Sequence, residues 1–163
     1  MSPAEAPAPA VPPGDVDAVM LALQALVGVA AESVAQVEDR VTLPQLRVLV
    51  LIASRGTQNV NSVARAMGIH PSNASRACDR LVAGGLLVRS ESAVDRRNLV
   101  LDLTEEGRAL VAGLVEHRRR AVSRVLAQVP DTKRRVLVRA MNAFGRAAGE
   151  GPAGEAWKLG WHD

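Results

Sequence analysis

The stretch NVNSVARAMGIHPSNASRACDRLVAGGLLV, residues 59–88, predicts two short helices joined by a tight turn. The first helix is expected over about 62–67, because Gly68 is the residue type that most often follows a helix end. The second is expected over 71–83, since Pro71 suits a first turn and two glycines follow the last residue. This arrangement is typical of a helix-turn-helix.

The second of these helices has two different faces when its residues are placed at helical spacing. Its inward positions are Ala74, Ala77 or Cys78, and Leu81. Its predicted DNA contacts are Ser72, Asn73, Ser75, Arg76 and Arg80. Small, polar and cationic side chains fit a DNA major groove, because Asn can read adenine, Arg can read guanine, and Ser can bond to a base or a phosphate. The alternative is a solvated helix face that binds nothing.

Two strand-like runs, LLVRSE at 86–91 and NLVLDL at 98–103, follow this helix. In the second run leucines alternate with other residues, which is the period of a half-buried strand. The connecting residues, SAVDRR at 92–97, make a hairpin directly after the helix-turn-helix, which is the arrangement of a wing. Taken alone, the tripeptide DRR at 95–97 would also fit a salt-bridged surface turn.

This combination resembles the MarR family of winged-helix transcription regulators over about residues 15–148. The matching positions are Gly85 and Leu86, then Asp95, Arg96 and Arg97, then Leu103, Thr104 and Gly107. The resemblance implies that Asp95 braces the wing by pairing with an arginine, for which Arg89 is the candidate. It also implies that Arg96 and Arg97 contact DNA, with Arg97 reaching into the minor groove. Narrow minor grooves concentrate negative potential and so attract arginine.

The composition favours one mainly helical domain. The 163 residues are 48% hydrophobic but only 2% aromatic, so the core must be packed through Leu, Val and Ala. Residues 1–39 hold six acidic and no basic residues, whereas residues 40–100 hold nine arginines and three acidic residues. A basic central segment is expected where one face of a protein meets a polyanion. Charge alone would also fit RNA, acidic lipid or an acidic protein.

The predicted fold class is mainly α with a small β-wing (α+β). The predicted parts are a disordered Pro/Ala-rich tail at 1–13, a MarR-like domain at 14–148, and a C-terminal tail at 149–163. Within the domain, dimerisation helices at 14–39 and 105–148 flank a winged helix-turn-helix at 42–104.

The flanking helical segments carry long apolar stripes. Apolar residues recur at three- and four-residue steps from Val16 to Val37, and Thr104 and Asp131 are expected to cap two further helices, the second broken from Gly145. One small winged domain cannot cover this much apolar surface. Because members of the family interlock through such helices, the resemblance implies a twofold homodimer that presents two recognition helices to a pseudo-palindromic DNA site. Packing within one chain is the alternative.

Other classes of protein are not indicated. No apolar run reads as a membrane span and the N-terminus does not read as a signal peptide, so a cytoplasmic protein without a membrane partner is expected. Cys78 is the only cysteine, and no Cys/His spacing predicts a metal site, so no cofactor is expected. No catalytic motif is recognised, and we expect no enzyme.

These expectations describe a dimeric, sequence-specific regulator that binds double-stranded DNA and represses pseudo-palindromic promoter sites. The resemblance also implies that a small-molecule effector can release the DNA. The alternative function is a winged-helix protein-interaction module whose basic face binds an acidic partner.

The sequence leaves the roles of four features open. Cys78 faces inward, as a packing residue or as a redox sensor. His70 stands where Ser or Thr would be a better N-cap, and could contact a phosphate or only solvent. His117 could line a ligand cleft or belong to a solvated basic face. Trp157 and Trp161, four residues apart, could dock on the dimer or on a partner, or belong to a flexible end.

Overall fold

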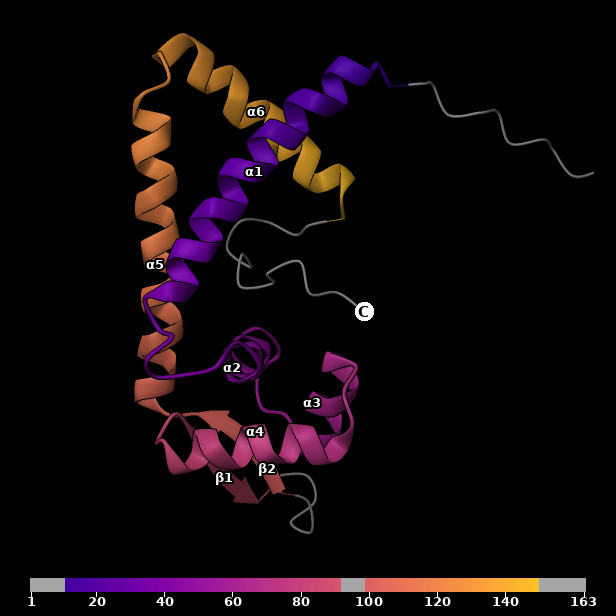
Figure 1. Cartoon of the computed structure of the whole chain (residues 1–163), viewed down its shortest axis with the longest axis vertical. Coiled ribbons are helices and arrows are strands. Elements are labelled where there is room, and N and C mark those ends of the chain that lie inside the picture. The colour runs from indigo at the N-terminus through magenta and orange to yellow at the C-terminus, as the bar shows by residue number, and fades with distance from the viewer. Residues whose placement is uncertain (1–10, 92–98, 150–163) are drawn as a thin grey trace, which may run out of the picture.

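Figure 1 shows a computed structural model of the chain, which describes residues 11–91 and 99–149. In chain order its elements are α1 (Pro13–Ala35), α2 (Leu43–Arg55), α3 (Val60–Met67), α4 (Pro71–Ala83), β1 (Leu87–Glu91), β2 (Leu99–Leu103), α5 (Glu105–Ala127) and α6 (Asp131–Ala147). Helices α1, α5 and α6 form one lobe, the remaining elements form the other, and α5 runs from one lobe to the other (Figure 1). The predicted fold class, mainly α with a two-stranded wing, is confirmed.

The core lies in the winged-helix lobe, around α2. Leu49 and Ile52 of α2 are almost completely buried, and they belong to one cluster with Val63 of α3, Leu81 of α4 and Leu101 of β2. The first half of α5 joins the same cluster. Burying one such side chain stabilises a fold by about 1.5–3 kcal/mol. Helix α4 is therefore held on a well-packed base.

The turn between α3 and α4 depends on Gly68 and His70. Gly68 has a φ of +62°, in the left-handed region that glycine adopts most readily, and it closes α3. His70 is the N-cap of α4, because its Nδ1 accepts a hydrogen bond from the Ser72 backbone N–H at 3.3 Å and lies 2.8 Å from the Ser72 Oγ. The sequence did not predict this capping role for a histidine.

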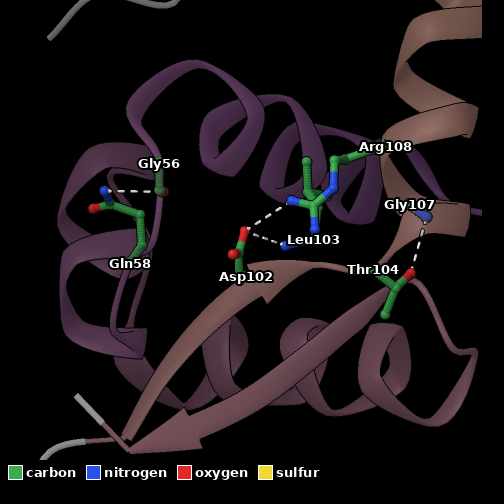
Figure 2. A network of polar contacts seen from close by, with 7 residues as sticks. All are labelled: Gly56, Gln58, Asp102, Leu103, Thr104, Gly107 and Arg108. Atoms are coloured by element: carbon green, nitrogen blue, oxygen red, sulfur yellow. Dashed lines mark hydrogen bonds and ion pairs between the residues drawn. The ribbon is translucent and has the colours of Figure 1, made fainter. Parts of the chain in front are cut away.

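The wing sheet is larger than its two predicted strands. Strands β1 and β2 pair antiparallel, with Leu87 opposite Leu103. Gln58 from the α2–α3 connection adds a bridge to β2. Its backbone N–H donates to the Leu101 carbonyl at 3.1 Å, and its backbone carbonyl accepts from the Leu101 N–H at 2.7 Å. The Gln58 side chain donates to the Gly56 carbonyl at 3.4 Å (Figure 2). The wing is thus tied to the helical part of its lobe.

A compact polar network joins β2 to α5 (Figure 2). Thr104 caps α5 as predicted, since its Oγ1 accepts from the Gly107 N–H at 3.0 Å. The same hydroxyl donates to the Gly85 carbonyl at 2.6 Å. Asp102 accepts from Arg108 of α5 at 3.4 Å. These bonds fix the direction in which α5 leaves the winged-helix lobe.

Helix α6 differs from its prediction at both ends. Pro130 is its N-cap, whereas Asp131 is its first residue and pairs with Arg134. The predicted Asp131 cap is therefore wrong. The helix also continues through Gly145 to Ala147, because a single glycine costs a helix only about 1 kcal/mol relative to alanine.

Helix α1 is apolar along most of its length. By length and composition alone it is long enough and apolar enough to cross a membrane, which corrects the expectation that no run approaches such a span. Its charged residues lie near its two ends, at Asp15, Asp17 and Glu32. Among its side chains only Ser33 is buried. The same apolar length also fits a helix that packs against a second protein surface.

Candidate nucleic-acid interface

Helix α4 has the two faces that its sequence predicts. Ala74, Cys78 and Leu81 are buried in the lobe, with Ala77 partly so. The opposite side chains are exposed, namely Ser72, Asn73, Arg76 and Arg80, while Ser75 is partly exposed. The exposed set combines hydrogen-bonding amide and hydroxyl groups with two cations. This is the chemistry that reads base edges and contacts phosphates.

Asn73 and Arg76 are bonded to each other on this outward face. The Arg76 Nη2 donates to the Asn73 Oδ1 at 2.6 Å, and its Nε donates to the Ser72 carbonyl at 3.4 Å. These bonds hold both side chains against α4 and leave the Asn73 amide nitrogen as a donor. The Asn73 Oδ1 has a second lone pair, so reading an adenine with both amide atoms would bring the base and Arg76 onto the same oxygen. The two residues are therefore expected to act as one unit.

The wing is anchored on α4 by an ion pair. The Arg89 Nη2 of β1 lies 2.5 Å from the Asp79 Oδ1 of α4, and the Ser75 hydroxyl donates to the Asp79 Oδ2 at 3.3 Å. Arg89 thus has an acidic partner on the recognition helix, a pairing that differs from the predicted one with Asp95. The predicted brace at Asp95 and the predicted DNA contacts at Arg96 and Arg97 lie outside the described residues.

Further polar residues, which were not among the predicted contacts, lie beside α4. A groove lined in part by Thr42 and Gln45 of the α2 start adjoins Asn73, Arg76 and Arg80. A second groove is lined by Arg55, Gln58, Ser62, Arg65 and Ala66. The T-x-x-Q pattern at 42–45 is the sequence signature of a capping box at a helix start. Such a local pattern does not indicate that this start lies next to the recognition helix.

Comparisons with known proteins agree with this geometry. Residues 41–98 match the family model of the MarR family. Over 111 residues the chain is 32% identical to the HTH-type transcriptional repressor MdtR of Bacillus subtilis (strain 168), covering 67% of this chain and 72% of MdtR. The HTH-type transcriptional regulator YfiV of the same organism is 32% identical over 106 residues, 65% of this chain and 66% of YfiV. The crystal structure of RV1404 from Mycobacterium tuberculosis superposes with a TM-score of 0.73, at 40% identity, covering 88% of this chain and 100% of that one.

The chain belongs to the MarR family. It is a helix-turn-helix transcriptional regulator, in which α3 and α4 form the helix-turn-helix and β1 and β2 form the wing.

The single cysteine of this MarR-family chain is a packing residue by its surroundings. Cys78 is completely buried on the inward face of α4. Burial raises the pKa of its thiol to about 11, against a smaller opposing effect from the nearby Arg89 charge. Because the thiolate is the reactive form, a raised pKa makes the thiol less reactive towards oxidants.

A second polar cluster lies in the other lobe, between α1 and α5. The Arg118 Nε donates to the Oγ of the buried Ser33 at 2.7 Å, and Ser33 donates to the Ala30 carbonyl at 2.6 Å. Burial lowers the pKa of Arg118. Within the described part of the chain, the buried Arg118 Nη1 and His117 Nε2 atoms have no hydrogen-bond partner. Residues 11–91 and 99–149 contain no group of three or more side chains arranged to hold a metal ion.

Proposed function

We propose that this MarR-family regulator is a cytoplasmic homodimer, without enzymatic activity, that binds pseudo-palindromic DNA sites through α4 and represses the promoters containing them. The outward face of α4 carries this proposal. Asn73 and Arg76 stand exposed and mutually bonded there, while the opposite face of the helix is buried. A helix held in this way can lie in a major groove with its polar face on the bases. Ser72, Ser75 and Arg80 are the further proposed contacts from this helix.

The wing is proposed as a second DNA contact. In the sequence Arg96 and Arg97 fall between β1 and β2, and β1 is tied to α4 through Arg89 and Asp79. A hairpin anchored beside the recognition helix is well placed to reach the neighbouring minor groove. An arginine there gains affinity from the negative potential without reading one particular base. We propose that Asp95 braces the wing by pairing with an arginine, with Arg89 as the candidate partner.

The dimer is proposed from the apolar surface of α1 and α6. Helix α6 has no buried residue and α1 has one, yet both expose large apolar side chains. The most exposed of these are Leu21, Val27, Val136 and Phe144, each more than half exposed. Between α1, α5 and α6 lies an apolar groove of about 330 Å³. A second copy, packed around a twofold axis, would bury these surfaces and place two α4 helices on one side of the assembly.

Repression and effector control have separate support. MdtR, the relative named above, is called a repressor, and bound protein at a promoter commonly blocks transcription. The unpartnered buried Arg118 Nη1, next to the Arg118–Ser33 bond, favours a small-molecule effector, because a buried donor without a partner is costly and an anionic ligand would accept from it. A ligand seated between α1 and α5 could alter the spacing of the two winged-helix lobes.

The proposed function is tested with duplexes that the wild-type protein selects from a random pool. The protein should bind selected duplexes about a thousandfold more tightly than random duplexes of the same length, or tighter still. Because several phosphates are neutralised, affinity should also fall steeply, by about a thousandfold or more, between about 50 and about 200 mM salt. A protein that shows no selectivity and no such salt dependence, but binds an acidic protein, would instead be a protein-interaction module.

A further inference from the structure

A polar groove lies between the start of α2 and the outward face of α4. Its volume is about 290 Å³, and its lining includes Thr42 and Gln45 on one side and Asn73, Arg76 and Arg80 on the other. Of the described residues that line it, none is acidic and two are arginines. The groove therefore offers positive charge and amide groups to whatever enters it.

Of the two arginines that line this groove, Arg80 is the one that is not bonded to another described residue. Arg76 is bonded to Asn73, and Arg89 on the wing is paired with Asp79. In contrast, the exposed Arg80 side chain makes no hydrogen bond or ion pair with any residue of the described ranges. An exposed guanidinium offers five N–H donors, so it can bind an anion without first breaking a bond within the protein.

Gln45 is held in place by the capping box of α2. The Thr42 backbone N–H and hydroxyl both donate to the Gln45 Oε1, at 2.8 and 3.0 Å. This fixes the side chain and leaves its amide nitrogen, with two N–H donors, as the free end of the group. Two elements far apart in the sequence thus bring a fixed amide and an unpaired guanidinium to one groove.

We propose that this groove holds one phosphate of the DNA backbone, clamped between Arg80 of α4 and Gln45 of α2. The inference rests on the proposed function, because it assumes that α4 lies in a major groove. A helix with its side chains nearly fills that groove, so the residues along its flank and on the adjacent element meet the backbone of one strand. Arg80 and Gln45 then position α4, while Asn73 and Arg76 remain for the bases.

Gln45→Glu tests the clamp without disturbing the fold. A carboxylate oxygen can accept the same two bonds from Thr42, and a negative charge is favourable in the first turn of a helix, so the melting temperature should be unchanged or slightly higher. The new charge would repel a phosphate. Affinity for selected and random duplexes should therefore fall by about tenfold or more, the effect of losing one charge-assisted hydrogen bond. Gln128→Glu, which adds the same charge at the far end of α5, should bind DNA as the wild type does.

Arg80→Ala gives a second, independent readout. Selected and random duplexes should lose affinity by the same factor, and the slope of log affinity against log salt should decrease by about one for each half-site. Arg120→Ala, which removes an exposed arginine from α5, is the matched control.

The proposal is overturned if Gln45→Glu binds both kinds of duplex as tightly as the wild type. It is also overturned if Arg80→Ala lowers the affinity for selected duplexes much more than the affinity for random duplexes, because Arg80 would then read a base. A wild-type protein without any selectivity would contradict the proposed function itself. The two failures are thus distinguished in the same titration.

Discussion

The guanidinium of Arg89 lies 2.5 Å from the carboxylate of Asp79, so the first strand of the wing is bonded directly to the recognition helix. Both side chains are partly exposed, and pairs of this kind contribute little to folding. The importance of the contact is geometric. It sets where the hairpin stands relative to α4, and therefore whether the helix and the wing can contact one DNA duplex together.

Replacing this carboxylate should affect DNA binding more than stability. In Asp79→Asn the free energy of unfolding should fall by less than about 1 kcal/mol, as urea titration would show. DNA affinity should fall several-fold, because the wing is no longer held against α4. Asp131→Asn removes a comparable pair with Arg134 on α6 and should leave DNA binding unchanged. Equal DNA affinity in the two variants would show that the Arg89 contact does not position the wing.

Gly107 is packed too tightly for any side chain. A Cβ at this position would lie 2.1 Å from the Leu86 carbonyl oxygen and 3.1 Å from its carbon, and backbone atoms cannot easily move away. Gly107→Ala should therefore lower the free energy of unfolding by about 2–4 kcal/mol in chemical denaturation. Gly113→Ala on the same helix meets no atom within 4 Å and should be neutral or stabilising by up to about 1 kcal/mol. Similar losses in both variants would contradict the close approach.

The buried thiol of Cys78 should make stability depend on alkaline pH. Its pKa is raised from 9.0 to about 11, mainly by burial, so the unfolded chain releases this proton at a lower pH than the folded one. The stabilisation of the folded state that comes from keeping this thiol protonated is fully present below about pH 9 and is lost as the pH rises to about 11. A pKa difference of one between the folded and unfolded chain corresponds to about 1.4 kcal/mol. The free energy of unfolding should thus fall more between pH 8.5 and 10.5, roughly the titration range, in the wild type than in Cys78→Ala. Parallel pH profiles would show that the thiol ionises normally.

Local signals explain why much of α4 could be predicted from the sequence. Gly68 and Pro71 end one helix and start the next through their own backbone preferences. The buried positions of α4 follow from helical spacing, and the structure confirms Ala74, Cys78 and Leu81 as inward-facing. Each of these inferences needs only residues within a few positions of one another.

Contacts between distant segments could not be predicted in this way. The bridge from Gln58 to Leu101 and the approach of Gln45 to Arg80 join residues that only the folded chain brings together. The Asp131 cap failed for a different reason. Pro130 took the N-cap position, which a single-residue preference for Asp does not anticipate.

A charge on the exposed apolar surface of α1 should separate the proposed dimer. Leu26 lines the groove between α1, α5 and α6, and its side chain is about half exposed within one chain. Leu26→Glu should leave the helical content unchanged and shift the protein to monomer in sedimentation, because a carboxylate buried in the interface loses its hydration. Val11→Glu, at an exposed apolar residue before α1, is the control. A Leu26→Glu protein that sediments as the wild-type dimer would place the interface elsewhere.

The central claim is that α4 reads DNA bases, and the most direct test is the ratio of the dissociation constants for random and selected duplexes, measured for the wild type and for Arg76→Ala. A base-edge contact discriminates between sequences, whereas a phosphate contact does not. Arg76→Ala should therefore reduce this ratio by about tenfold or more, equivalent to about 1–3 kcal/mol at each base contacted, and should change the affinity for random duplexes much less. An unchanged ratio, with both affinities lowered by the same factor, would contradict the assignment of α4 as the helix that reads the bases.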